Sequence, residues 1–383
     1  MRLPSGRFLI GLVLVLVVCV ATAYVLTSGK DDPPGGGGTA QAVTVTCLGG
    51  SEKTELMADE QVKKILREQY GLTVVFAPLG SYDLVQLSKD DLAARKAGCL
   101  WPSSASAQKV FESLHSGAFP EYRAETVLQS PEVIYAGPQG TDALVKAGIV
   151  QKRAERYFIV DMKKLLLEHV LKRTTWQSLG TADLRGPIAV SSTDAAKSNS
   201  GFTLAQLQLN IIATDDVFSA PSLAQARKVL PTVRAVYDAQ GLQAAGSEAG
   251  FRQWLTQGAE FHAPLYAGYE NQLIQQVVQL GADADKLLKD VRVLYPDPTI
   301  YSDHPILALD ADAARFLEAM KDAGIQQLAW QKYGLRSGLH VGLSKVTDFP
   351  NLPLADQFRT TAPPGAEVTL ALLACVKEVA KCS

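Results

Sequence analysis

The pattern of hydrophobic and polar positions divides the chain into two unlike parts. Phe8–Thr27 is one apolar run of about twenty residues without a charge, long enough to cross roughly 30 Å of hydrocarbon as a helix. From Val43 onward, short β-rich runs alternate with helical patterns, which is typical of α/β architecture with mostly parallel strands. The predicted strands include Val43–Leu48, Leu72–Ala77, Glu132–Ala136, Val291–Leu294 and Ile306–Leu309. The predicted helices include Glu52–Tyr70, Tyr157–Lys172, Gly201–Ala213, Asn271–Leu280, Ala311–Tyr333 and Glu367–Lys381.

The charges around the apolar run predict export of everything that follows it. Arg2 and Arg7 precede the run, and the positive flank of a membrane segment stays in the cytoplasm. Three interpretations compete: a retained anchor, a signal peptide cleaved near Ala21–Ala23, and a lipoprotein signal at Cys19, whose neighbours fit that pattern poorly.

A Gly/Pro-rich linker at residues 28–42 favours the retained anchor, because a tether needs an attached end. We therefore expect one transmembrane helix at residues 1–27. The soluble part would then lie outside the cytoplasm at the cell membrane, with secretion after signal cleavage as the alternative.

Composition excludes several classes of protein. The 37 Lys and Arg residues nearly balance 39 Asp and Glu residues, and the net charge of −2 argues against a nucleic-acid binder. Hydrophobic residues make up 47% of the chain, so sizeable cores can form. The exported part is longer than one core comfortably supports, and two lobes are expected.

Four cysteines follow Cys19, and none has CxxC spacing, so disulfides are favoured over a metal site in an oxidising compartment. Three pairings exist on paper. Cys47 and Cys99 each end a predicted strand, whereas Cys375 and Cys382 share the C-terminal segment. We predict the pairs 47–99 and 375–382.

Enzyme signatures are largely missing. The sequence has no GxSxG, GxxxxGK[ST] or HExxH motif, and its five histidines are scattered. We expect no enzymatic activity, no cofactor and no metal site.

A different unit recurs three times: a strand, a loop rich in Gly and Ser, and the start of a helix. The copies begin at Val45, Cys99 and Ile188. Free N–H groups at a helix start, together with Ser hydroxyls, suit an oxyanion or carboxylate. Any single Ser there can equally be an ordinary N-cap. Three copies facing one cleft make ligand binding the better interpretation.

The order of these motifs resembles the type II extracytoplasmic solute-binding proteins, especially the molybdate-, sulfate- and phosphate-binding components of ABC importers. The resemblance covers roughly Val43 to Lys381. It rests on the Ser-rich loops, on Ser130–Tyr135 as a strand between lobes, on Tyr295–Ile306 as the return crossover, and on Trp330–Arg336.

This resemblance implies two α/β lobes joined by a hinge. The first lobe would comprise residues 43–134 and 303–383, including the C-terminal helix, and the second lobe residues 135–302. It places the following residues at the ligand cleft: Ser51, Ser103, Ser104, Ser191, Ser192, Ser198, Asn199, Ser200 and Glu270.

Three acidic or basic residues are ambiguous. Glu270 would repel an anion unless it were protonated or paired, and it can instead be a first-turn acid that favours the helix dipole. If it faces the ligand, a zwitterion, an amine or a metal complex fits. Asp303 and His304 are ligand contacts in one interpretation and hydrogen-bonded hinge residues in the favoured one.

We therefore expect a monomeric binding protein that captures a small solute, with an anion as one candidate, and presents it to an ABC permease or a sensor. The alternative is an envelope interaction protein on the same fold whose cleft binds no ligand.

Overall fold

The computed structural model describes residues 42–154, 157–241 and 243–383, and residues 42–383 form one compact unit. No helix within these described ranges is long and apolar enough to span a membrane. The predicted span, and the predicted linker up to residue 41, lie outside them.

The described residues form a sheet of ten strands. Eight of them pair in the order β2-β1-β3-β9-β4-β8-β6-β5, and β10 and β7 pair with β4 outside this path. In chain order the strands are β1 (Val43–Gly49), β2 (Leu72–Pro78), β3 (Ala97–Trp101), β4 (Arg123–Ala136), β5 (Val150–Arg153), β6 (Tyr157–Asp161), β7 (Leu265–Tyr269), β8 (Arg292–Asp297), β9 (Tyr301–Ala308) and β10 (Arg336–Ser337).

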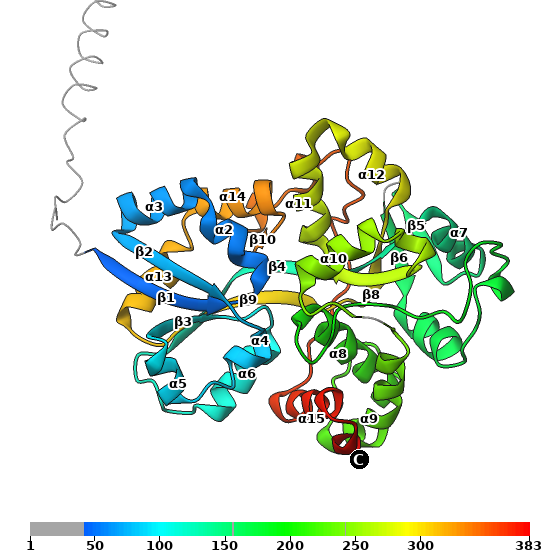
Figure 1. The fold of residues 1–383 in the computed structure, drawn as a ribbon, viewed down its shortest axis with the longest axis horizontal. Coiled ribbons are helices and arrows are strands. Elements are labelled where there is room, and N and C mark those ends of the chain that lie inside the picture. The colour runs from blue at the N-terminus through cyan, green and yellow to red at the C-terminus, as the bar shows by residue number, and fades with distance from the viewer. Residues whose placement is uncertain (1–41, 155–156, 242) are drawn as a thin grey trace, which may run out of the picture. The chain divides into compact units, whose positions relative to one another are not determined.

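The long strand β4 belongs to two parts of this path. Its residues Arg123–Pro131 pair with β9, and from Glu132 onward it pairs with β7 and β8. Figure 1 shows β4 and β9 running between the part that holds β1 and the part that holds β8. We call the part around β1, β2, β3 and β9 the first lobe, and the part around β5, β6, β7 and β8 the second lobe.

Helices cover both lobes. Those packed mainly on the first lobe are α2 (Thr54–Ala58), α3 (Glu60–Tyr70), α4 (Ser81–Leu84), α5 (Lys89–Ala94), α6 (Ala105–Leu114), α13 (Ala311–Ala319) and α14 (Ala323–Tyr333). Those of the second lobe are α7 (Pro138–Lys146), α8 (Asn199–Thr214), α9 (Leu223–Asp238), α10 (Ser247–Thr256), α11 (Glu270–Leu280) and α12 (Ala284–Asp290).

The predicted helix Glu52–Tyr70 is broken at Asp59. Its backbone is extended there, with φ −62° and ψ 126°, and its side chain accepts hydrogen bonds from the N–H groups of Gln61 and Val62. Asp59 thus acts as the N-cap of α3 and separates it from α2. At the other end, Gly71 adopts the left-handed conformation predicted for a C-cap, with φ 63°.

The prediction of one helix over Tyr157–Lys172 is wrong in its first part. Tyr157–Asp161 forms β6, which pairs with both β5 and β8, and a short helix follows at Lys164–Val170. The run Tyr-Phe-Ile-Val is aromatic and β-branched, and a place between two strands outweighs its helical periodicity.

Both predicted disulfides are confirmed. Cys47 and Cys99 occupy paired positions on the adjacent parallel strands β1 and β3. Cys375 and Cys382 close a loop at the end of α15 (Ala366–Lys377).

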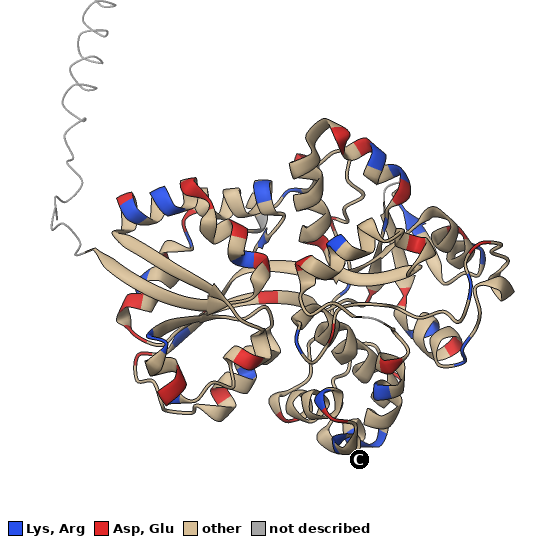
Figure 2. Ribbon diagram, viewed as in Figure 1, with Lys and Arg blue, Asp and Glu red and all other residues tan. Residues whose placement is uncertain are grey.

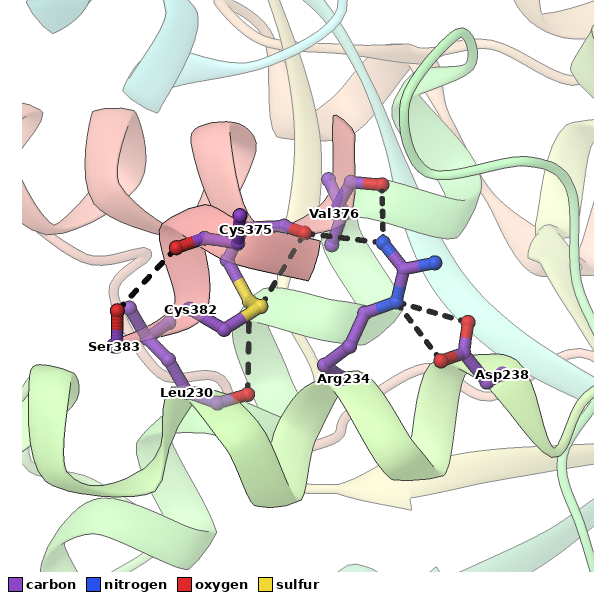
Figure 3. Close-up of a disulfide and its surroundings, with 8 residues drawn as sticks. Leu230, Arg234, Asp238, Cys375, Val376, Cys382 and Ser383 are labelled. Carbon is purple, nitrogen blue, oxygen red and sulfur yellow. Dashed lines mark hydrogen bonds and ion pairs between the residues drawn. A yellow bond between two sulfur atoms is a disulfide. The ribbon is translucent and has the colours of Figure 1, made fainter. Parts of the chain in front are cut away.

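The C-terminal helix α15 is predicted to belong to the first lobe, but it packs on helices of both lobes: α6 and, more extensively, α9. Arg234 of α9 donates from Nη1 to the carbonyl oxygens of Cys375 and Val376, at 3.1 and 2.8 Å (Figure 3). A cation at the C-terminal end of a helix pairs with its unsatisfied carbonyl groups and its dipole. Arg234 therefore holds α15 against the second lobe.

An apolar cluster also crosses from one lobe to the other. It includes Leu48 and Phe111 of the first lobe, Phe202 and Leu230 of the second, and Leu372 of α15. Within it the ring of Tyr82 in α4 lies 4.3 Å, centroid to centroid, from the ring of Phe202 in α8. The two lobes therefore share buried apolar surface as well as crossing strands.

Candidate functional site

A pocket of about 250 Å³ opens between the two lobes, where five loop-to-helix junctions meet. Most of its lining residues are small or polar, and none of the lining residues is aromatic. The lining residues are Gly50, Ser51, Glu52, Pro78, Leu79, Gly80, Ser81, Ser103, Lys197, Ser198, Asn199, Ala245, Gly246 and Ser247.

A buried ion pair between Lys53 and Glu52 lies at the first-lobe wall of the pocket, where Glu52 is a lining residue. The Lys53 ammonium is completely buried and donates to Glu52 Oε1 at 2.5 Å, to Ser103 Oγ at 2.9 Å and to His304 Nδ1 at 2.9 Å. An ammonium has three N–H donors, so this one is fully used by the protein. The pair brings Glu52, and not a free cation, to the pocket.

The protonation states follow from these contacts. Burial alone would raise the pKa of Glu52, but the Lys53 ammonium holds it well below its ordinary value, so the carboxylate is ionised. Burial lowers the pKa of Lys53, and the Glu52 charge opposes that change. Burial and the Lys53 charge lower the pKa of His304 to about 4, so this ring is neutral at pH 7.

The neutral ring links the ion pair to the crossing strand β9. Because an ammonium can only donate, Nδ1 of His304 accepts from Lys53 and Nε2 carries the proton. Nε2 lies 3.2 Å from Ser302 Oγ, which in turn donates to the Ser103 carbonyl at 2.8 Å. His304 is therefore a hydrogen-bonded residue of the crossover.

On the second-lobe wall, the helices α8 and α10 both begin at the pocket. Their N-cap residues Ser198 and Gly246 make no side-chain capping hydrogen bond. The hydroxyl of Ser247 lies 3.1 Å from that of Ser198 and 3.0 Å from that of Ser200, so three hydroxyls form one cluster at these helix starts. The N–H groups and hydroxyls at the two helix starts give this wall a positive potential. Lys197 also lines the pocket and forms an ion pair with Asp194, Nζ to Oδ2 at 3.3 Å.

Direct hydrogen bonds join the lobes beside the pocket. Asn199 Nδ2 donates across the lobes to the Ser103 carbonyl at 2.7 Å, and within the second lobe to the Tyr269 hydroxyl at 2.8 Å. Deeper in the interface, Gln206 Nε2 lies 2.9 Å from Ser106 Oγ. The lobes thus contact each other through protein groups.

The structure brings only part of the predicted cleft set together. Ser51, Ser103, Ser198 and Asn199 line the inter-lobe pocket. Ser104 and Ser200 are buried next to it, the first as the N-cap of α6 and the second bonded to Thr193 and Ser247. Ser191 and Ser192 line a different pocket, within the second lobe.

Glu270 is not among the residues that line the inter-lobe pocket. Its two oxygens accept from Arg336, Nε to Oε2 at 2.7 Å and Nη2 to Oε1 at 2.8 Å, and Oε1 also accepts from the Tyr295 hydroxyl. A buried carboxylate in this bidentate pair is part of the packing between α11 and β10. Asp303 likewise accepts from Gln129 on the neighbouring strand, at 2.7 Å.

Sequence reasoning missed Glu52, Lys53, Gly246 and Ser247. Glu52 and Lys53 follow Ser51 directly, so a signal was present: a charged pair beside a Gly-Gly-Ser loop that ends a buried strand. The junction at residues 78–81, between β2 and α4, lines the pocket and was also missed. Gly246 and Ser247 lie in a fifth junction, which no strand precedes, so the recurring pattern could not find it.

The surface charges do not indicate a further binding surface in the view of Figure 2. Lys and Arg alternate with Asp and Glu over the helices of both lobes in the view of Figure 2, and neither sign gathers into a face there. Among the described residues, no group of three or more His, Cys, Asp or Glu side chains could hold a metal ion.

Comparison with solved structures agrees on one architecture. A periplasmic thiamin-binding protein superposes with a TM-score of 0.56 at 12% identity, over 89% of this chain and 96% of that chain. Apo FutA2 from Synechocystis PCC6803 has a TM-score of 0.52 at 11% identity, over 90% and 99%. A ferric binding protein from Campylobacter jejuni has a TM-score of 0.52 at 13% identity, over 87% and 97%.

No protein-family model and no curated protein sequence matches this chain. The fold is that of the type II periplasmic solute-binding proteins, and it extends over nearly all the described residues.

Proposed function

We propose that this protein is an extracytoplasmic solute-binding protein that holds one small polar solute in the pocket between its lobes. The observation that carries the proposal is the mostly polar pocket of about 250 Å³ whose walls come from both lobes, at five junctions between loops and helices. A solute that touches both walls stabilises the closed arrangement relative to any open one.

The chemistry of the walls narrows the solute class. The starts of α8 and α10 favour an acidic group, such as a carboxylate or an oxyanion. The ionised Glu52 on the opposite wall favours a hydroxyl or an amine at the other end of the solute. A small hydroxy acid or zwitterion fits better than a compact dianion, which Glu52 would repel, or a ring that needs aromatic stacking.

The sharpest test fills the pocket from Gly246. This N-cap glycine has extended backbone, φ −146° and ψ 149°, and a Cβ built on it meets only Ser51 Oγ, at 3.9 Å. Gly246→Leu therefore places a side chain in the pocket without backbone strain. We expect it to abolish the thermal stabilisation that small hydroxy acids, amino acids or oxyanions give the unaltered protein in a ligand screen.

Gly365→Leu is the matched control. Gly365 is also an N-cap glycine with extended backbone, φ −65° and ψ 168°, and a Cβ there meets nothing within 4 Å. It should leave every ligand response unchanged. A full screen without stabilisation of the unaltered protein, or equal responses of both variants, contradicts solute binding at this pocket.

We further propose that the solute is delivered to an ABC permease or to a membrane sensor, and that the protein acts as a monomer on the outer side of the cell membrane. The fold shared with periplasmic binding proteins supports the location and the partner class. Pull-down of the protein with a permease from its own membrane, dependent on the ligand found in the screen, tests this step.

One observation favours a second candidate, an envelope interaction protein without a solute. The ring contact between Tyr82 and Phe202 and the hydrogen bond from Asn199 to Ser103 connect the lobes through protein groups alone. A protein that is already held closed needs no ligand to keep its outer surface in one conformation. A negative ligand screen together with a stable complex with another envelope protein would select this candidate.

A further inference from the structure

A second pocket, of about 180 Å³, lies inside the second lobe and is separate from the inter-lobe site. Its walls come from β7, from α10 and from the segment after α9. The lining residues are Ser191, Ser192, Gln240, Gly241, Ala244, Gly250, Gln253, Trp254, Gln257, His262, Ala263 and Tyr266. None of them is Asp, Glu, Lys or Arg.

Two buried polar groups in this lining have no hydrogen-bond partner among the described residues. They are the hydroxyl of Tyr266 and Nε2 of Gln240. Tyr266 is 4% exposed and Gln240 is 6% exposed. A buried donor without a partner costs roughly 1–3 kcal/mol, so two around one pocket need an explanation.

The position of the Tyr266 hydroxyl is fixed by its surroundings. A Cβ built on Gly250 would lie 2.4 Å from this oxygen, so the hydroxyl lies directly over the bare backbone of α10, at a residue that also lines the pocket. Burial and the nearby Glu132 and Glu248 raise the pKa of Tyr266, so the group stays protonated and can donate. Gln240 Nε2 can only donate.

The apolar part of the lining is aromatic. The rings of Trp254 and Tyr266 lie 5.9 Å apart, centroid to centroid, at an interplanar angle of 18°. The indole N–H of Trp254 is already used, because it donates to the Ala263 carbonyl at 2.9 Å. Trp254 therefore offers a ring surface and no hydrogen bond.

We propose that this pocket is a second binding site, for a small uncharged aromatic molecule that carries a hydrogen-bond acceptor such as a carbonyl oxygen. The acceptor takes the two unpaired donors, Tyr266 O–H and Gln240 Nε2–H, and the ring lies against Trp254. A cavity of about 150 Å³ lined by apolar side chains can hold a benzene molecule, so about 180 Å³ accommodates a single substituted ring.

Charge excludes close relatives of that ligand. A carboxylate in this pocket would find no Lys or Arg in the lining and would lie near Glu132 and Glu248, which act on the Tyr266 hydroxyl. An ammonium would find no carboxylate in the lining. The two groups without partners, Gln240 Nε2 and the Tyr266 hydroxyl, are hydrogen-bond donors like the ammonium itself. The site is therefore distinct in chemistry from the inter-lobe pocket, which contains Glu52 and two helix starts.

Benzamide is the probe, with benzoate as its charged counterpart. Calorimetric titration of the full-length protein should give binding for benzamide and at least tenfold weaker binding for benzoate. Tyr266→Phe should weaken benzamide about tenfold, the effect of one lost hydrogen bond in a buried site, without lowering the unfolding temperature, since that hydroxyl has no partner in the protein. Ala244→Leu, which fills the pocket, should abolish binding.

Two control variants make the result specific. Tyr333→Phe removes a hydroxyl of the first lobe that donates to Asp59, and it should leave benzamide binding unchanged. Gly246→Leu blocks the inter-lobe pocket and should also leave it unchanged, although both pockets share α10. Failure of the inter-lobe proposal would therefore not affect this result.

Any of three outcomes overturns the proposal. They are no benzamide binding to the unaltered protein, benzoate binding as tight as benzamide binding, or benzamide binding by Tyr266→Phe and Ala244→Leu as tight as by the unaltered protein. The first outcome would mean that only water satisfies the two donors. A crystal structure grown with benzamide gives the same decision directly.

Discussion

Lys53 shows how one residue fixes the electrostatics of the inter-lobe pocket. Its ammonium is completely buried, and its three donors go to Glu52, Ser103 and His304. Because no N–H of Lys53 is left for a ligand, this buried ammonium gives an anion no hydrogen bond. The attraction comes from the helix starts at Ser198 and Gly246 and from Lys197, which lines the pocket.

His304 predicts a specific loss of stability in acid. Its pKa is about 4 in the folded protein and has an ordinary value of 6.5, so between these values the unfolded chain binds the extra proton. The contribution of His304 to stability is therefore complete above pH 6.5 and is lost as the pH falls toward 4. Integrated over the shift it amounts to about 3 kcal/mol.

Urea unfolding of the unaltered protein and of His304→Gln, at pH 7 and at pH 4.5, measures this contribution. The free energy of unfolding of the unaltered protein should fall more steeply, because the variant has no imidazole to titrate. Burial raises the pKa of Glu132, so protonation of this group stabilises the folded protein as the pH falls, opposite to the effect of His304. Both proteins contain Glu132, so its contribution cancels in the comparison. Parallel pH dependences of the two proteins would contradict the neutral buried ring.

At the scale of elements, the two disulfides are expected to stabilise the protein to different extents, because they close loops of different length. Cys47 and Cys99 are 52 residues apart and join two strands of the first-lobe sheet. Cys375 and Cys382 are only 7 residues apart and stiffen the end of α15, where Arg234 meets the last carbonyl groups. Loop-closure entropy grows with the logarithm of loop length.

We expect the variant Cys47→Ala with Cys99→Ala to lose about 4 kcal/mol of stability and the variant Cys375→Ala with Cys382→Ala about 2.5 kcal/mol. Chemical unfolding of both double variants under oxidising conditions gives the two values. All four cysteines are buried, so the cavity left by each substitution is similar in the two variants. A larger loss from the C-terminal pair would show that it stabilises by holding α15 between the lobes, and not through loop closure.

At the scale of the whole molecule, the packing between the lobes predicts a closed apo protein. The apolar cluster around Phe202, the bonds from Asn199 and Gln206, and α15 all connect the two lobes. Small-angle scattering of the ligand-free protein should match the closed structure. A solute in the inter-lobe pocket should change the radius of gyration little and mainly raise the unfolding temperature.

Phe202→Ala tests whether packing between the lobes keeps the apo protein closed, because it removes part of that packing. Deletion of a buried Phe side chain typically costs 3–5 kcal/mol, and here part of that loss falls on the contact with Tyr82 across the lobes. The variant should scatter as a more open particle. If the unaltered apo protein is already open and contracts on ligand addition, inter-lobe packing is weaker than these contacts indicate.

Several features followed from the sequence because they depend on neighbours along the chain. The alternation of β-rich and helical runs predicted the α/β class, Gly71 predicted a helix end, and the two disulfide pairs were inferred from which cysteines end strands or share a segment. Ser51, Ser103, Ser198 and Asn199 were found because loop-to-helix junctions have a local signature. The error at Tyr157–Asp161 arose where a strand partner outweighed local periodicity.

The tertiary structure decided everything that depends on contacts between distant residues. It paired Glu270 with Arg336, 66 residues away, and thereby removed that carboxylate from consideration as a ligand contact. It brought Lys53 to His304, 251 residues away, and placed Ser191 and Ser192 at a second pocket. Sequence determines which groups a segment can offer, whereas burial and partnership, which set charge and accessibility, arise only when the two lobes pack together.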